Sequence, residues 1–287
     1  ADEGPDTIRR AKHLTLPLYR PLVKQLVARP KPPPSRRCLS VVQPQGMRIH
    51  ADFAVAAAVH FDAAKFIESP AAGVSRFMLD RIGEEKARAT TIVRYQPNSR
   101  FPEHEHIGGE EFMVLAGTFK DQFGEFPAGT YVRNPIGSKH APWVDEDGCT
   151  IMVKLLQMAE TGEGTSPLHV DFGKTKSEQA QQTPFGSKSR LYSNEKTGEV
   201  VEALWAHADA SIPADELALK GEEIFVVDGS IALDGEAFER WGWCRFPAAP
   251  PSDKRLSLKA GPVGATLYRK TGHLTEEAMR MERIKIT

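Results

Sequence analysis

Beyond its first fifty residues, the chain consists of short apolar runs separated by turn residues. Typical runs are residues 89–95 (ATTIVRY), 111–115 (EFMVL) and 150–155 (TIMVKL), and turn signals such as Gln96-Pro97-Asn98 follow them. Short runs that are rich in β-branched and aromatic residues and bounded by Gly, Pro or Asn predict β-strands. Many such strands at roughly even spacing favour an all-β sandwich or barrel.

The two halves of this region repeat one another. Residues 109–117 (GEEFMVLAG) match residues 221–229 (GEEIFVVDG) without a gap, at an offset of 112 residues. A repeat of this length indicates two copies of one domain. We therefore predict a first domain over 51–158 and a second over 190–287, joined by a polar linker over 159–189.

The first fifty residues differ from the rest in charge. They hold ten basic and three acidic residues, a net charge of +7, whereas residues 51–287 carry −8. The run Arg29-Pro30-Lys31-Pro32-Pro33-Pro34 cannot lie inside a helix and favours an extended chain. Residues 1–50 are therefore predicted to form a basic arm, either a solvated tail or a segment that contacts an acidic protein partner. Its Arg-rich, acid-poor start is typical of a targeting segment, which predicts an intracellular location, cytoplasmic or mitochondrial.

Composition excludes several classes of protein. The chain is 40% hydrophobic and 26% charged with a net charge of −1, which is ordinary for a globular protein and argues against nucleic-acid binding. No apolar stretch approaches the ~18 residues of a transmembrane helix. The cysteines, Cys38, Cys149 and Cys244, include no C-x-x-C pair, which argues against a disulfide scaffold, a zinc ribbon or an iron–sulfur cluster.

Four residues of the first domain could hold a metal ion: His104, His106, Glu110 and His140. Side chains two positions apart on a strand project from one face, so the first two imidazoles can point at one ion. The glutamate begins the next apolar run, and a turn built by Pro135 and Gly137 could bring the third histidine back to the others.

Three neutral imidazoles and one carboxylate suit a divalent transition metal. Iron or zinc is expected first, and manganese, nickel and copper are also compatible with these ligands. If the ion prefers six ligands, two positions remain for water, dioxygen or a chelating substrate.

The motifs around these residues resemble those of the cupin superfamily. The first cupin motif, G-x5-H-x-H-x3,4-E-x6-G, is matched from His104 to Gly117, although Asn98 stands at its opening glycine. The second, G-x5-P-x-G-x2-H-x3-N, is matched from Gly129, with Val144 at its terminal asparagine. The resemblance implies a jelly-roll (double-stranded β-helix) barrel with the metal inside it. Glu111 could replace Glu110 as ligand, but the spacing to Gly117 favours Glu110.

A closer resemblance, to the ChrR-type cupins, extends over residues 66–158 and includes Gly108-Gly109-Glu110-Glu111-Phe112. This group includes the cupin domain of a zinc-dependent anti-sigma factor and is similar to dioxygenases that cleave β-diketones, as acetylacetone-cleaving enzymes do. Anti-sigma factors also carry a helical zinc module with clustered ligands. The arm offers only His13, Cys38 and His50, so sigma-factor binding is not expected.

The second domain lacks most of these ligands. At the repeat offset, the positions of the histidine pair hold Glu216 and Ala218, and that of the third histidine falls near Ser252. Only Glu222 retains a ligand type. One glutamate without imidazole partners holds a transition metal poorly, so we predict a degenerate second cupin barrel without a metal.

Two residues of the second motif, Tyr131 and Arg133, share one strand face and are candidates to reach the metal cavity. Periodicity alone does not say whether that face points inward. Three tryptophans of the second domain are expected as core or interface aromatics: Trp205, Trp241 and Trp243.

Three functions are compatible with these features. The first is a metal-dependent dioxygenase acting on a small diketone or hydroxy-ketone, with no catalytic residue identified beyond the ligands. The second is a non-catalytic accessory subunit of a larger assembly, organellar for example, in which the metal stabilises the fold. The third is a sensor of a small molecule or of redox state. A homo-oligomer is compatible with each of them.

Overall fold

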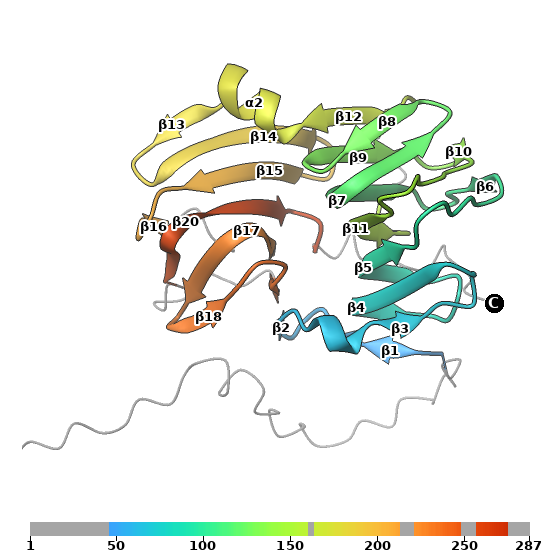
Figure 1. Cartoon of the computed structure of the whole chain (residues 1–287). Coiled ribbons are helices and arrows are strands. Elements are labelled where there is room, and N and C mark those ends of the chain that lie inside the picture. Colours follow the sequence, from blue (N-terminus) through green and yellow to red (C-terminus); the bar gives the residue numbers. More distant parts are fainter. Residues whose placement is uncertain (1–45, 160–163, 213–220, 248–256, 275–287) are drawn as a thin grey trace, which may run out of the picture.

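The computed structural model describes residues 46–159, 164–212, 221–247 and 257–274, drawn in colour in Figure 1. Most of the predicted basic arm lies outside these residues, as do Glu216, Ala218 and Ser252. Neither described helix has the length and apolar composition needed to cross a membrane.

Two nine-stranded antiparallel sheets form the body of the molecule (Figure 1). The first sheet contains β1 (Arg48–Ile49), β3 (Ile67–Glu68), β4 (Val74–Ile82), β5 (Arg88–Tyr95), β7 (Glu110–Asp121), β8 (Gly124–Pro127), β9 (Thr130–Asn134), β11 (Cys149–Leu155) and β12 (Leu168–Asp171). A two-stranded ribbon of β6 (His104–Glu105) and β10 (Lys139–His140) lies beside it.

The second sheet contains β2 (Ala57–Val59), β13 (Gln181–Thr183), β14 (Gly186–Asn194), β15 (Glu199–Ala206), β16 (Ser211–Ile212), β17 (Glu222–Leu233), β18 (Glu236–Phe238), β19 (Trp243–Phe246) and β20 (Leu258–Thr271). Two short helices, η1 (Ala63–Lys65) and α2 (Phe172–Glu178), complete the described elements. The all-β fold with two jelly-roll barrels is confirmed.

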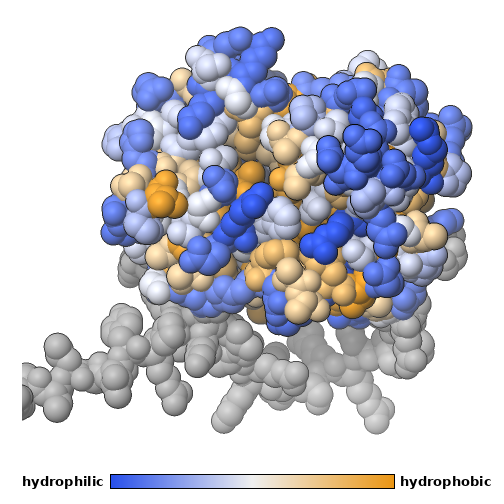
Figure 2. Space-filling view, viewed as in Figure 1, coloured by the Kyte–Doolittle hydropathy of each residue, from blue (hydrophilic) through white to orange (hydrophobic). Residues whose placement is uncertain are grey.

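The central strands are apolar on both sides because each sheet is buried on both faces. In the first sheet Val93 and Ile151 face the interior of the first barrel, whereas their neighbours Ile92 and Met152 pack toward the second sheet. Strands covered on both faces carry apolar residues without alternation, as at residues 151–153. Figure 2 shows hydrophilic residues over the outer edges of both halves and apolar ones between them.

The repeated glycines are required at a close backbone contact. Gly117 in β7 and Gly229 in β17 both have positive φ, 70° and 73°. A Cβ added at either would collide with a carbonyl oxygen of the neighbouring strand, that of Gly148 or Gly264 respectively. The repeat therefore marks an equivalent β-bulge in each barrel, where the backbones of two neighbouring strands approach closely.

The two barrels exchange one strand each, β2 and β12. β2, which precedes the first barrel, pairs with β19 of the second sheet, with Val59 opposite Trp243. β12, which precedes the second barrel, pairs with β9 of the first sheet, with Val170 opposite Tyr131. Each barrel is therefore completed by a strand that leads into the other.

This exchange changes the picture of the segment 159–189, which the sequence predicts as a polar linker. It contains β12, α2, β13 and the start of β14. The α2 helix begins where the Asp171 side chain accepts a hydrogen bond from the Lys174 amide, a capping contact typical of Asp. The polar composition of this segment reflects short elements at the surface.

Candidate metal centre

The β6–β10 ribbon and the first residue of β7 bring the four predicted ligands together. His104 and His140 are directly opposite each other in the ribbon. His106 lies just beyond β6, where its amide donates to the Ser138 carbonyl at 2.9 Å, and Glu110 begins β7. The tight turn predicted at Pro135 and Gly137 therefore returns the third histidine to the first.

The nitrogen and oxygen atoms of these side chains converge. One ring nitrogen of each of His104, His106 and His140 lies within 4.8 Å of the others. His106 Nε2 is 3.0 Å from His140 Nε2 and 3.3 Å from Glu110 Oε2, and His140 Nε2 is 3.6 Å from the same oxygen. Only His104 of the four is exposed. Among the described residues this is the only group of three or more His, Cys, Asp or Glu in such an arrangement.

Neighbouring groups fix the orientation of the ligands. His140 Nδ1 lies 3.0 Å from Asp121 Oδ2, and His104 Nδ1 lies 3.0 Å from the Pro102 carbonyl oxygen. Asn134 Nδ2 donates to Glu110 Oε2 at 3.0 Å. A histidine that donates through Nδ1 presents the lone pair of Nε2, which is the tautomer that a metal requires.

The protonation states also fit a metal centre. Burial lowers the pKa of His106, which keeps its imidazole neutral at pH 7. Burial alone would lower the pKa of His140 too, but the hydrogen bond to Asp121 and the charge of Glu110 raise it. Because a metal displaces a proton from such a site, binding there should be pH-dependent.

The ligands line a cavity of about 630 Å³ in the first barrel. Apolar side chains form much of its wall: Val74, Val93, Tyr95, Phe101, Phe119, Val153 and Leu155. A metal bound here would face a largely apolar space that is large enough for a small organic molecule.

Three residues considered from the sequence face away from this cavity. Glu111 is opposite in orientation to Glu110, since neighbouring residues on a strand point to opposite faces, and it lies between the barrels. Tyr131 and Arg133 lie on that same side, where both donate to Glu111. Tyr131 and Arg133 share one strand face, as the sequence predicts, and that face points away from the metal cavity.

A buried charge network joins the two barrels at this place. Lys154 in β11 is the strand neighbour of Glu111, and Lys270 in β20 is the strand neighbour of Glu223. Each lysine nevertheless bonds to the glutamate of the other barrel: Lys154 Nζ lies 2.6 Å from Glu223 Oε1, and Lys270 Nζ contacts Glu111. All four side chains are at most 2% exposed.

Further crossing contacts extend the network. Arg133 pairs with Glu199 at 2.9 Å, and Arg245, its equivalent at the repeat offset, pairs with Asp80 at 2.8 Å. Trp243 Nε1 donates to Glu223 of its own barrel at 2.7 Å, and its buried ring belongs to the apolar cluster that contains residues of both barrels. Burial alone would raise the pKa of the Glu223 carboxyl, but Lys154 and its other partners hold it well below its usual range.

The second barrel gives its retained glutamate a different partner. Glu222 is fully buried, and its Oε1 accepts from Arg269 Nε at 2.8 Å. Arg269 precedes Lys270 just as Val153 precedes Lys154, so Arg269 corresponds to Val153. In the first barrel this position holds an apolar residue that lines the cavity, and in the second barrel it holds a cation. A guanidinium therefore neutralises this carboxylate in the second barrel.

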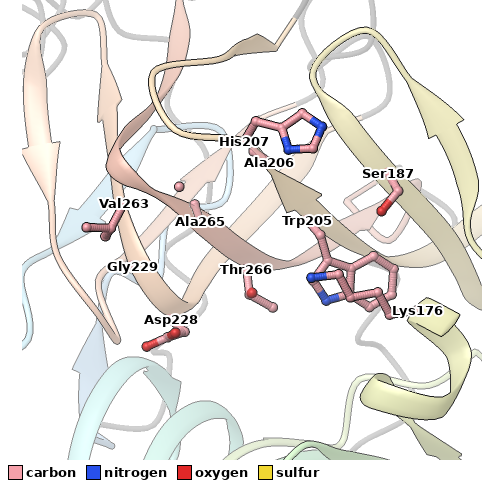
Figure 3. Close-up of a pocket in the computed structure, with 11 residues that line it drawn as sticks. Lys176, Ser187, Trp205, Ala206, His207, Asp228, Gly229, Val263, Ala265 and Thr266 are labelled. Atoms are coloured by element: carbon pink, nitrogen blue, oxygen red, sulfur yellow. The ribbon is translucent and has the colours of Figure 1, made fainter.

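A separate cavity of about 340 Å³ lies on the second sheet (Figure 3). Lys176, Trp205, His207 and Asp228 line it, with Thr266 on the central strand between them. It contains a single histidine and a single carboxylate, which is too few for a transition-metal site.

Sequence reasoning missed the residues that orient the ligands. Asp121 and Asn134 carry no motif of their own. At the repeat offset, however, Leu233 and Phe246 stand in their places. The signal that could have identified Asp121 and Asn134 is a difference between the two halves. Each position is polar in the half with the histidines and apolar in the half without them.

Comparison with known proteins agrees with this geometry. Residues 54–159 match the model of the ChrR cupin-like domain family. A search of curated protein sequences finds no significant match.

Solved structures with the same fold include three with similarity over most of their length. A Pseudomonas aeruginosa protein assigned as glyoxylate-induced has a TM-score of 0.57 and 14% identity, covering 79% of this chain and 90% of its own. The nickel-bound pirin YhhW of Escherichia coli has a TM-score of 0.55 and 13% identity, covering 76% and 98%. A Nostoc punctiforme protein assigned as a dioxygenase has a TM-score of 0.53 and 13% identity, covering 79% and 82%.

The first barrel therefore matches the ChrR cupin-like domain family, and the chain as a whole shares its fold with these solved structures.

Proposed function

We propose that this protein is a metal-dependent dioxygenase that cleaves a small diketone or hydroxy-ketone in the first barrel. The observation that carries the proposal is the convergence of His104, His106, His140 and Glu110 at the wall of a mostly apolar cavity. The nickel-bound and dioxygenase-assigned neighbours are compatible with it, although at 13% identity they support the fold alone.

The donor set fits a divalent transition metal, with iron or zinc expected first and manganese or nickel also compatible. Three imidazole nitrogens and a carboxylate oxygen match the ligand preferences of these ions. When bound, a redox-active ion such as Fe(II) would supply Lewis acidity and the oxygen chemistry. Asp121 and Asn134 would hold the ligands in place, and the apolar wall would exclude water from the reacting groups.

The test is oxygen uptake by protein reconstituted with Fe(II). A β-diketone such as pentane-2,4-dione and one O2 would give one carboxylic acid and one 2-oxoaldehyde, so uptake should match loss of the diketone. The same measurement with a hydroxyaryl ketone covers the other substrate class. A protein that holds stoichiometric Fe(II) but consumes no oxygen with either class would refute the dioxygenase.

The second candidate is a non-catalytic accessory subunit. The Glu222–Arg269 pair favours it, because in the second barrel a guanidinium binds the glutamate that corresponds to the metal-site residue Glu110. In that case metal should raise the thermal midpoint of unfolding without supporting oxygen uptake. Copurification as a fixed component of a larger assembly would be the second expected result.

A further inference from the structure

The cavity of the first barrel contains one cation that is withdrawn from solvent. Besides Glu110, the charged side chains lining it are Arg76, Glu85, Lys86 and Glu105. The Arg76 side chain is 13% exposed, whereas those of Glu85 and Glu105 are 60% and 47% exposed, and Lys86 is also exposed. An apolar cavity with one partly buried guanidinium is suited to an organic anion.

The position of Arg76 follows from the strand pattern. Arg76 lies two residues after Val74 in β4 and opposite Val93 in β5, and both valines line the same cavity. The face of the sheet that carries the apolar wall therefore also carries the guanidinium.

Arg76 has hydrogen-bonding capacity to spare. Its Nη2 donates to Glu85 Oε1 at 3.1 Å, but its Nε is buried and has no hydrogen-bond partner. A guanidinium has five donors in a planar fork that matches a carboxylate. A buried donor without a partner is costly, so a ligand that satisfies it gains affinity.

Glu85 shows how a carboxylate reaches this guanidinium. It lies on the turn between β4 and β5, and its side chain is largely exposed. An ion pair with one exposed partner contributes little free energy, so an incoming anion can displace it.

We propose that Arg76 binds a carboxylate of the substrate, and that Glu85 occupies this position when no substrate is present. The substrate class is then an acidic diketone or hydroxy-ketone. This inference rests on the proposed function, which assigns the dicarbonyl end to the metal centre. The hydrogen bond and ion pair of Arg76 are to Glu85 and not to a metal-site residue, so we place the carboxylate at the end of the substrate away from the metal.

The experiment measures binding to zinc-loaded protein by titration calorimetry, because zinc undergoes no redox chemistry. The probes are 4,6-dioxoheptanoate, a β-diketone with a remote carboxylate, and its methyl ester. The acid should bind more tightly than the ester by roughly 10- to 100-fold, the range for charge-assisted hydrogen bonds. Arg76→Met should remove this preference and leave both the ester affinity and the bound zinc unchanged.

Two further variants sharpen the test. Glu85→Gln removes the competing carboxylate and should tighten binding of the acid by about 2- to 5-fold without affecting the ester. Lys86→Met removes an exposed cation from the same turn and should leave the preference intact. The inference is overturned if acid and ester bind equally, if the acid does not bind, or if Lys86→Met has the effect of Arg76→Met.

The outcome separates this inference from the proposed function. An acid preference that depends on Arg76, together with no oxygen uptake by the Fe(II) protein, would retain the binding site and reject the dioxygenase. Oxygen uptake with equal use of acid and ester would retain the dioxygenase and reject the carboxylate site at Arg76.

Discussion

The two barrels share one scaffold but stabilise the same buried glutamate in different ways. In the first barrel Glu110 lies among two buried imidazoles and accepts from Asn134. In the second, Glu222 accepts from Arg269. A buried carboxylate needs a compensating partner, and in the second barrel, which lacks the histidine pair at the repeat offset, a guanidinium supplies it. The metal site is therefore a local property of one barrel, whereas the charge network between the barrels is a property of the pair.

The largest effect should come from removing a metal ligand. His106→Ala should reduce bound metal, measured by elemental analysis after reconstitution, from one equivalent to near zero, because the remaining ligands no longer converge. His207→Ala in the cavity of the second sheet is the matched control and should retain full occupancy. Full occupancy in His106→Ala would show that the ligand set is wrong.

The next effect separates the two halves of the charge network. Lys154→Met should lower the free energy of unfolding by about 3–5 kcal/mol, since it leaves Glu223 buried without a full positive charge. Lys270→Met should cost about 1–2 kcal/mol less, because Glu111 keeps Arg133 as a partner. Guanidinium chloride unfolding measures both.

The control for this pair is Lys259→Met, which removes an exposed ion pair with Asp209. It should change the free energy of unfolding by less than about 1 kcal/mol. If Lys154→Met cost no more than Lys259→Met, the buried network would contribute nothing specific.

The smallest effect concerns His273, which contacts Glu223 at 3.0 Å. Burial lowers the pKa of His273 to about 4, and its equivalent in the first barrel is Gln157. Below its usual pKa near 6.5, the unfolded chain binds a proton that the folded chain does not, so stability falls as pH drops from 6.5 to 4. Between pH 6.5 and 4, the free energy of unfolding of His273→Gln should therefore fall by about 2–3 kcal/mol less than that of the wild type.

The measurement is the free energy of unfolding of wild type and His273→Gln at pH 7, 5.5 and 4. The wild-type curve should fall more steeply over this interval. Parallel curves for the two proteins would mean that His273 is protonated in the folded chain.

The sequence predicts the barrels well because their signals are local. Turn residues bound each strand, and Gly117 and Gly229 mark a bulge whose close backbone contact only glycine permits. The grouping of the three histidines is also predictable, since His104 and His106 lie two apart and the turn before His140 has a recognisable composition.

The remaining features depend on contacts between distant segments. β2 is a three-residue run, Ala57–Val59, whose partner β19 lies near the other end of the chain, and no local pattern specifies that pairing. The faces of Tyr131 and Arg133 could not be oriented either, because a strand buried on both sides has no polar face.

The exchange of β2 and β12 also has a consequence for how the protein is made. During synthesis β2 emerges directly after β1 and ahead of every other described strand, yet its partner β19 is among the last strands to appear. β2 therefore stays unpaired until nearly the whole polypeptide has left the ribosome. Contacts between residues so far apart in the sequence form slowly. A fragment ending after the first barrel would lack β12 as well as the partner of β2. We therefore expect the two barrels to fold as one cooperative unit, in which β2 pairs only after β19 has been synthesised.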